Sequence, residues 1–263
     1  MPDRRKHRGP HPEDARLFDF PAQQLLRAAA ADFSWLLGRG YPHDSGLKLV
    51  GDRYALVARQ RTAISRCCCS DADAAWRRSR QVEAEQLRGA LLWVDGYNVL
   101  TSIEAALAGG VILAARDGAY RDMASMHGSY RKVAETLPAL DLLGHTIAAF
   151  HVAECLWFLD QPVSNSGRLK RIIEALAAAQ GWPWRAELVP DPDIVLAGPM
   201  AEVARETPQP RPVAGTEDLP VPAGIVVATA DSAILDHCAA WFNLARETIV
   251  QSVPRAWVVD LGA

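Results

Sequence analysis

The stretch that indicates the fold is Leu91-Leu92-Trp93-Val94-Asp95-Gly96-Tyr97-Asn98-Val99-Leu100. Its apolar run predicts a buried strand, and the Asp-Gly pair predicts a turn directly after it. Residues 225–231 repeat the pattern, with an apolar strand that ends in Asp231. In a parallel α/β sheet, ligands bind outside the carboxyl ends of the strands. We therefore expect Asp95 at the mouth of a site, with Asn98 one helical turn later beside it.

Strand and helix patterns alternate beyond Gly89. Five apolar segments are typical of strands, at 91–94, 153–159, 186–189, 225–229 and 256–259. Helical patterns lie between them, notably at 101–108, 131–150, 168–179 and 232–247. This alternation predicts an α/β domain over residues 89–263, with a mainly parallel sheet flanked by helices. The first strand should be central, because its apolar run is unbroken. The segment 197–224 contains six prolines and is predicted to be a long Pro-rich loop.

A small basic helical domain is predicted ahead of the sheet, over residues 1–88, with a disordered arm at its N-terminus. Helical spacing runs over 21–37, followed by apolar segments at 47–50 and 54–67 and a charged linking helix at 71–88. The third of these segments carries Arg59 and Arg61. These two arginines are candidates for RNA binding, although a solvated face is the commoner role of such residues.

The composition is that of an ordinary soluble globular protein, with 49% apolar and 22% charged residues among 263. No apolar run approaches the roughly 20 residues that span a bilayer, and the basic N-terminus lacks the apolar region of a secretory signal. We therefore expect a cytoplasmic protein with no membrane partner. The oligomeric state stays open, with a homodimer among the options.

The charge is divided unevenly along the chain. Residues 1–90 carry 16 Lys and Arg against 11 Asp and Glu, whereas residues 91–263 carry 12 against 20. A basic half joined to an acidic half suits a module that grips nucleic acid attached to one that binds metal. An uneven scatter of surface charge explains the same numbers equally well.

Acidic residues follow several of the predicted strands. Asp95 and Asp160 each come directly after one, Asp231 follows another by two residues, and Asp236 lies five residues beyond Asp231. Carboxylates gathered at one sheet edge repel each other unless a cation neutralises them, and hard oxygen ligands suit Mg²⁺ or Mn²⁺. We expect the first three to lie within about 6 Å of one another. The alternative is that each acid only caps a helix, which is common at strand-to-helix turns.

A small polar loop after Asp160 opens a helix with basic residues near its start. A phosphate could bind there, because helix N-termini present free N–H groups to anions. A plain Ser/Asn cap is the alternative. The residues concerned are Ser164, Asn165, Ser166, Arg168 and Lys170. A second polar segment, 116–131, could carry Arg121 and Arg131 over the site, or be a solvated connection.

Several other chemistries find no support in the residues. The chain contains no Walker A spacing, no G-x-G-x-x-G after the first strand and no G-x-S-x-G elbow. Cys67, Cys68 and Cys69 are consecutive, so their side chains diverge and do not favour a zinc site.

Two motifs resemble those of a known enzyme family. Residues 94–99, Val-Asp-Gly-Tyr-Asn-Val, resemble the opening motif of NYN-domain ribonucleases, which are relatives of the PIN nucleases, and residues 228–231 resemble their later T-x-D motif. The resemblance implies an α/β/α fold that cuts RNA with Mg²⁺ or Mn²⁺. It assigns Asp95, Asp231 and Asp236 as metal ligands, with Asn98 orienting the first carboxylate and Asp160 as a mid-domain acid.

Most of the chain also resembles a prokaryotic family described only as a domain of unknown function. Residues 47–54, the motif of the first strand and residues 162–170 carry that resemblance. This second resemblance implies no activity.

From the acidic residues and the resemblance to NYN-domain ribonucleases, we predict a metal-dependent endoribonuclease. The alternative is a non-catalytic RNA- or nucleotide-binding protein with a phosphate site at residues 164–170.

Overall fold

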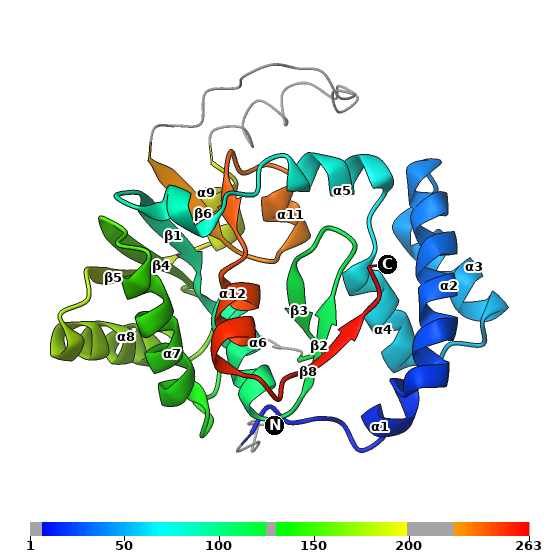
Figure 1. Cartoon of the computed structure of the whole chain (residues 1–263), viewed down its shortest axis with the longest axis horizontal. Coiled ribbons are helices and arrows are strands. Elements are labelled where there is room, and N and C mark those ends of the chain that lie inside the picture. Colours follow the sequence, from blue (N-terminus) through cyan, green and yellow to red (C-terminus); the bar gives the residue numbers. More distant parts are fainter. Residues whose placement is uncertain (1–6, 125–129, 199–223, 263) are drawn as a thin grey trace.

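A computed structural model describes residues 7–124, 130–198 and 224–262. Its main sheet has five parallel strands in the order β5-β4-β1-β6-β7 (Figure 1). The strands are β1 (Leu91–Asp95), β4 (Glu154–Asp160), β5 (Trp184–Val189), β6 (Ile225–Ala228) and β7 (Trp241–Phe242). The prediction of a parallel sheet with the first strand at its centre is therefore confirmed.

Helices cover both faces of this sheet. They are α6 (Gly96–Leu107), α7 (Thr136–Ala149), α8 (Ser166–Gln180), α9 (Pro192–Ala197), α11 (Ser232–Leu235) and α12 (Leu244–Ser252). The helix predicted at 232–247 is instead α11, the short strand β7 and α12. Hydrophobic periodicity could not reveal β7, because two residues are too few to show a strand pattern.

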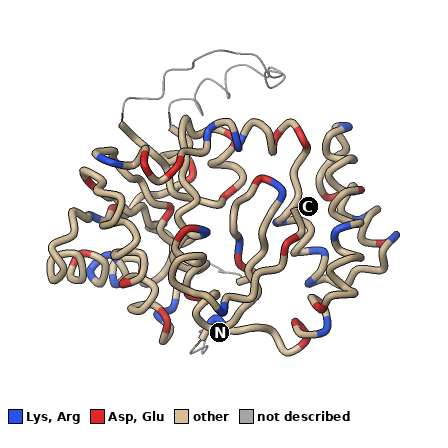
Figure 2. The backbone as a smooth tube through the Cα atoms, viewed as in Figure 1, with Lys and Arg blue, Asp and Glu red and all other residues tan. Residues whose placement is uncertain are grey.

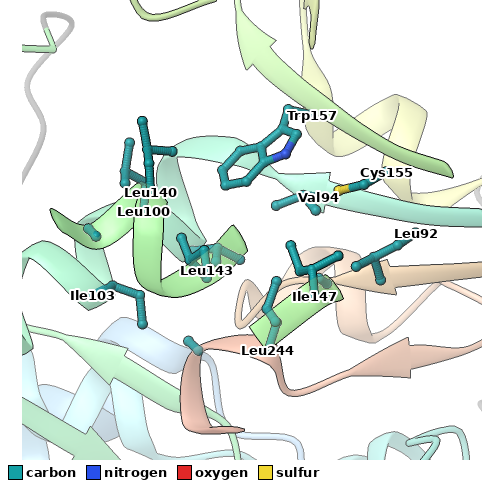
Figure 3. Close-up of a cluster of buried hydrophobic side chains, with 14 of the residues drawn as sticks. Leu92, Val94, Leu100, Ile103, Leu140, Leu143, Ile147, Cys155, Trp157 and Leu244 are labelled. Carbon is teal, nitrogen blue, oxygen red and sulfur yellow. The ribbon is translucent and has the colours of Figure 1, made fainter. Parts of the chain in front are cut away.

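Alternate residues of β1 face the two sides of the sheet, as the pleat requires. Leu92 and Val94 are fully buried on the face covered by α6, α7, α8 and α12, whereas Trp93 packs on the face covered by α9 and α11. Figure 3 shows the first of these clusters, in which Leu100, Leu143 and Leu244 are drawn with the two β1 residues. The central strand is thus covered on both sides.

A second sheet of three strands lies beside the first, in the order β3-β2-β8. It consists of β2 (Val111–Ala114), β3 (Tyr120–Asp122) and β8 (Trp257–Asp260), with β3 antiparallel and β8 parallel to β2. The predicted strand at 256–259 exists, but it belongs to this sheet. The sequence pattern did not reveal β2 and β3, which are short and flank a polar turn.

The N-terminal region is helical, as predicted. Its elements are α1 (Asp14–Leu17), α2 (Phe20–Gly38), α3 (His43–Arg53), α4 (Ala58–Cys67), α5 (Asp71–Arg78) and the 3₁₀ helix η1 (Ala84–Leu87). Phe33 of α2 and Ile64 of α4 share one hydrophobic core with Val111 of β2 and Val259 of β8. Figure 1 shows the second sheet between these helices and the rest of the fold. The helical region and the sheet region are therefore joined by a common core.

Part of the predicted disordered arm is packed against the fold. Arg8 is buried and forms an ion pair with the fully buried Glu104 of α6, and Asp14 is paired with Arg59. Residues 1–6 lie outside the described residues, as do residues 199–223 of the predicted Pro-rich loop. None of the described helices combines the length and the apolar character needed to cross a bilayer.

Candidate functional site

The candidate site lies where the strand order of the main sheet reverses. From β1 the chain passes to β4 on one side and later to β6 on the other, so the carboxyl ends of β1 and β6 flank the switch point. Val94 pairs with Ala228, which brings Asp95 level with Thr229. Ligands of open α/β sheets bind in the crevice at such a point. The structure therefore brings the two predicted motifs together.

Two side-chain hydrogen bonds join the ends of these strands. Thr229 Oγ1 donates to Asp95 Oδ2 over 2.8 Å, and the same oxygen accepts the Asp231 N–H over 3.0 Å. Asn98 Oδ1 accepts the Ala230 N–H over 2.9 Å. The NYN resemblance assigned Asn98 to orienting Asp95. In the structure the Asn98 side chain holds the loop after β6, while the Thr229 hydroxyl and the Asn98 backbone both bond the Asp95 carboxylate.

Gly96 allows α6 to start directly beneath Asp95. A Cβ added there would lie 2.8 Å from the Phe158 carbonyl oxygen and 2.5 Å from Leu159 Cδ2. Real Cβ atoms do not approach backbone oxygen so closely, so only glycine fits this turn against β4. The Asp-Gly pair is therefore a packing requirement of the site as well as a turn signal.

The electrostatics of the edge are those of crowded carboxylates. Asp95 is buried, and this burial, with the nearby charges of Asp231 and Asp193, raises its pKa to about 7 despite the Thr229 hydrogen bond. Asp193 lies after β5 and is exposed to solvent on part of its side chain. Partial desolvation, followed by the charges of Asp231, Asp191 and Asp160, raises the pKa of Asp193 to about 6. In the part of the chain that the structure describes, the charges that act on these two carboxylates are all negative.

Asp160 lies farther along the sheet edge than the β4 residue that pairs with Asp95. Asp95 pairs with Phe158 of β4, so Asp160 lies two residues beyond it, about 7 Å at the usual strand rise. Burial and the charge of Asp191 raise the pKa of Asp160, and its own charge acts on Asp193. The carboxylates thus form a row. Among the described residues, no three His, Cys, Asp or Glu side chains are placed to hold one metal ion.

The capping alternative is true of some of these acids. Asp231 accepts the Ala233 N–H over 2.7 Å and so caps α11, and Asp191 caps α9 by accepting the N–H groups of Asp193 and Ile194. Asp95 makes no side-chain cap on α6. Asp231 therefore has two roles. It caps α11, and its charge raises the pKa of Asp95.

Several residues that were predicted to bind metal or RNA form ion pairs with other side chains of the protein. Asp236 accepts a hydrogen bond from Arg77 Nε over 2.9 Å, and Arg121 is buried against Asp117. Arg59 pairs with Asp14, and Arg61 pairs with Asp52 over 2.8 Å. Figure 2 shows that both signs of charge occur along the N-terminal helices. The two arginines predicted to bind RNA are therefore each paired with a carboxylate of the same helical region.

The polar loop before α8 also has structural roles. The Ser166 hydroxyl is buried, 2.5 Å from the carbonyl oxygens of Asp160 and Val163 and 2.7 Å from the Tyr97 hydroxyl. Asn165 Nδ2 donates to the Tyr130 carbonyl over 2.9 Å, and the Ser164 carbonyl accepts the Tyr130 N–H over 3.2 Å.

Basic side chains remain exposed near this loop. Arg168 in the first turn of α8 and Arg131 beside the loop are exposed, whereas Lys170 is half-buried and lies 3.7 Å from Glu174. Arg168 and Arg131 are therefore available to bind an anion near this loop, whereas the Ser166 hydroxyl is already engaged in hydrogen bonds within the protein.

Three residues of the edge were not among the predicted site residues. Thr229 was visible in the T-x-D motif but had no assigned role. Asp191 and Asp193 follow β5 in the segment Pro190-Asp191-Pro192-Asp193, which carries the same signal as the others, an acid after an apolar strand. The sequence therefore contains the signal that would place both aspartates at the edge of the sheet.

Comparison with known proteins places the chain in a family. Residues 84–247 match the family described as domain of unknown function DUF5616. The chain belongs to this family. In this DUF5616 member, residues 25–80 also match a second family, described as protein of unknown function DUF434. Asp95, Asn98, Asp193 and Asp231 lie within the DUF5616 match, which begins just before β1.

A relative of this DUF5616 member occurs in Methanocaldococcus jannaschii. It is described as uncharacterized protein MJ0935 and is 31% identical over 154 residues, which cover 58% of this chain and 74% of the relative. No solved structure matches the chain. The chemistry of the site is therefore inferred from its own geometry.

Proposed function

We propose that this protein is a metal-dependent ribonuclease that hydrolyses phosphodiester bonds at the carboxyl ends of β1 and β6. The observation that carries the proposal is Asp95, a buried carboxylate at the switch point of a parallel sheet, set beside Asp231 and Asp193. Carboxylates that raise each other's pKa values are suited to receive a cation. The resemblance of residues 94–99 and 228–231 to NYN-domain motifs supports RNA as the substrate.

The donor set fits Mg²⁺ or Mn²⁺. Mg²⁺ usually binds through one or two carboxylates, with waters and substrate phosphates completing its octahedron. Asp95 and Asp231 supply two such carboxylates, so a cage of three protein ligands is not required. A bound ion of this kind would activate water and neutralise charge on the phosphate during in-line displacement.

The other residues of the edge would hold groups in place or move a proton. Thr229 fixes the orientation of Asp95, and Asn98 holds the Ala230 backbone and hence the loop that carries Asp231. Asp193 is exposed to solvent and stands close enough to Asp231 for the two charges to act on each other, so it would help to attract the cation and could accept a proton from the attacking water.

The exposed basic side chains near α8 would hold the RNA backbone. Ser166 ties the start of α8 to the end of β4, so Arg168 lies on the side of the acidic row where Asp160 stands. The hydrogen bonds between Tyr130 and the 164–165 loop bring Arg131 to the same place. Phosphate contacts of this kind position a strand without reading its sequence.

The test is cleavage of labelled single-stranded and structured RNA with Mn²⁺, with and without EDTA. We expect Asp95→Asn to lower the cleavage rate at least about 100-fold and to leave RNA binding largely unchanged, because it removes an anionic ligand but little volume. Asp141→Asn is the matched control, since Asp141 lies on α7 and faces His145 at 3.7 Å. Equal cleavage by both variants would exclude Asp95 from the chemistry.

A binding protein without cleavage is the second candidate, and the same assay separates the two. If the wild-type protein binds RNA and does not cut it, the site near α8 is the functional one. Arg168→Ala combined with Arg131→Ala should weaken binding and flatten its salt dependence in either case, by about 0.7 in log–log slope for each phosphate that the protein no longer neutralises. Because the hydroxyl of Ser166 is already engaged, the observations favour the nuclease.

A further inference from the structure

A buried network of two arginines and two carboxylates lies behind the proposed site. This arginine network comprises Arg77 of α5, Asp117 of the β2–β3 turn, Arg121 of β3 and Asp236 at the end of α11. The side chains of Arg77 and Asp117 are 5% and 1% exposed. Buried charges persist only when they are paired and hydrogen-bonded. Here two cations balance two anions.

The hydrogen bonds within the arginine network leave little freedom of movement. Arg121 donates through Nη1 and Nη2 to the two oxygens of Asp117, over 2.9 and 2.7 Å. Arg77 donates through Nη1 to Asp117 over 2.7 Å and through Nε to Asp236 over 2.9 Å. Burial opposes ionisation of Asp117, but the two guanidinium groups outweigh it and lower its pKa to about 2. Asp117 is therefore ionised at neutral pH.

The arginine network reaches the residues on either side of Asp231. Arg121 Nε donates to the Ala230 carbonyl over 2.7 Å. The Ser232 hydroxyl lies 3.2 Å from Arg77 Nη1 and 3.3 Å from Arg121 Nη2. The loop that carries Asp231 is thus held before and after that residue.

α11 depends on this support because it has only four residues. An isolated helix of that length is not stable in water, so its position must come from tertiary contacts. Arg77 bonds to Ser232 at its start and to Asp236 at its end, and Trp76 Nε1 adds a hydrogen bond to the Asp236 carbonyl over 3.1 Å. The position of α11, which directly follows Asp231, is therefore fixed by hydrogen bonds from α5.

We propose that Arg77 and Arg121 are positioning residues for Asp231, so that the N-terminal helical region completes the site at β1 and β6. The proposal rests on the proposed function. Arg77 lies within the DUF434 match and Asp231 within the DUF5616 match, so the arginine network joins the two. This gives the helical region a role other than the RNA binding predicted for Arg59 and Arg61.

The test is hydrogen–deuterium exchange of the full chain carrying Arg77→Lys, with Arg66→Lys as the matched control. Arg66 is also an N-terminal arginine, and it bonds the carbonyls of Asp122 and Ala124 over 2.5 and 2.9 Å rather than a residue of the loop that carries Asp231. A lysine keeps the charge but cannot donate to Asp117, Asp236 and Ser232 together. We expect exchange in residues 226–238 to rise about tenfold in Arg77→Lys, with 154–160 unchanged.

In Arg66→Lys, residues 226–238 should exchange as in the wild type. Unchanged exchange there in a folded Arg77→Lys protein would overturn the proposal, and so would an equal rise in both variants. If Arg77→Lys does not fold, Ser232→Ala removes the shared acceptor without leaving a buried charge unpaired, and should raise exchange over the same residues.

The exchange measurement needs no cleavage, so it decides the proposal even if the wild-type protein cuts no RNA. Where cleavage is found, Arg77→Lys should lower kcat while KM for RNA stays within about twofold, because positioning of a metal ligand affects the reaction more than phosphate contacts elsewhere. A rise in KM with unchanged kcat would contradict a positioning role.

Discussion

Thr229 donates a hydrogen bond from Oγ1 to Asp95 Oδ2 over 2.8 Å, and this bond joins the carboxyl ends of β6 and β1. The same hydroxyl oxygen accepts the Asp231 N–H over 3.0 Å. One buried threonine therefore links two of the acids on which the proposed chemistry depends. The contribution of this hydroxyl can therefore be measured by replacing Thr229 while both acids are kept.

Thr229→Val should destabilise the protein by about 1–3 kcal/mol, because it leaves the buried Asp95 carboxylate and the Asp231 N–H without their partner. Urea unfolding near pH 8 measures the loss. Thr62→Val is the control, since the Thr62 hydroxyl bonds only the Ala58 carbonyl within an exposed turn of α4. If both variants lose the same stability, the hydrogen bond to Asp95 has no special weight.

Stability should fall as pH rises from about 4 to about 7 through the raised pKa of Asp95. In this range the folded protein holds a proton that the unfolded chain has released, so increasing pH favours unfolding. The effect should be on the order of a few kcal/mol for a fully buried carboxyl. Unfolding free energies of the wild type and Asp95→Asn, measured in EDTA across this range, should converge at low pH. Parallel curves would contradict the shift.

Gly96→Ala should cost about 1–3 kcal/mol, because the added Cβ would lie 2.8 Å from the Phe158 carbonyl oxygen. Gly167→Ala is the matched control. A Cβ there meets nothing within 4 Å, so this variant should gain about 0.4–1 kcal/mol from the stiffer unfolded chain. Thermal unfolding of the two variants should therefore move in opposite directions, and a shared direction would argue against the tight turn below Asp95.

Arg59→Gln should destabilise the fold by about 3 kcal/mol, because the side chain of its partner Asp14 is fully buried and would lose its counter-charge. Arg16→Gln is the control, since Arg16 and Glu13 are both exposed and such pairs contribute little. Urea unfolding separates the two. A folded Arg59→Gln protein of wild-type stability that binds RNA more weakly would restore Arg59 to the binding role predicted from the sequence.

Much of the main sheet could be predicted because β1, β4 and β6 are apolar runs that end at an Asp or are soon followed by one. The β1 run, continuous from residue 91 to 94, indicated a strand covered on both faces, and the structure confirms its central place. β7 and β3 were not predicted, because strands of two and three residues are too short to show periodicity. Their positions come from long-range pairing, which a local pattern does not contain.

The residues of the site could be predicted from the sequence only in part, for a similar reason. Strand ends reveal which acids reach the edge, so Asp95 and Asp231 could be named from the sequence. The register that places Phe158 opposite Asp95, and hence Asp160 two residues farther along, depends on which strands pair. The pairing of Arg121 with Asp117 likewise depends on the tertiary structure. A basic residue in the sequence carries no sign of whether it faces solvent or a buried carboxylate.

The central claim is that Asp95 and Asp231 bind a divalent ion, and Mn²⁺ binding followed by electron paramagnetic resonance tests it most directly. The wild-type protein should bind Mn²⁺ near neutral pH. Asp95→Asn and Asp231→Asn should each weaken the affinity at least about tenfold, and Asp141→Asn should not change it. Equal Mn²⁺ affinity in the wild type, Asp95→Asn and Asp141→Asn would contradict the claim.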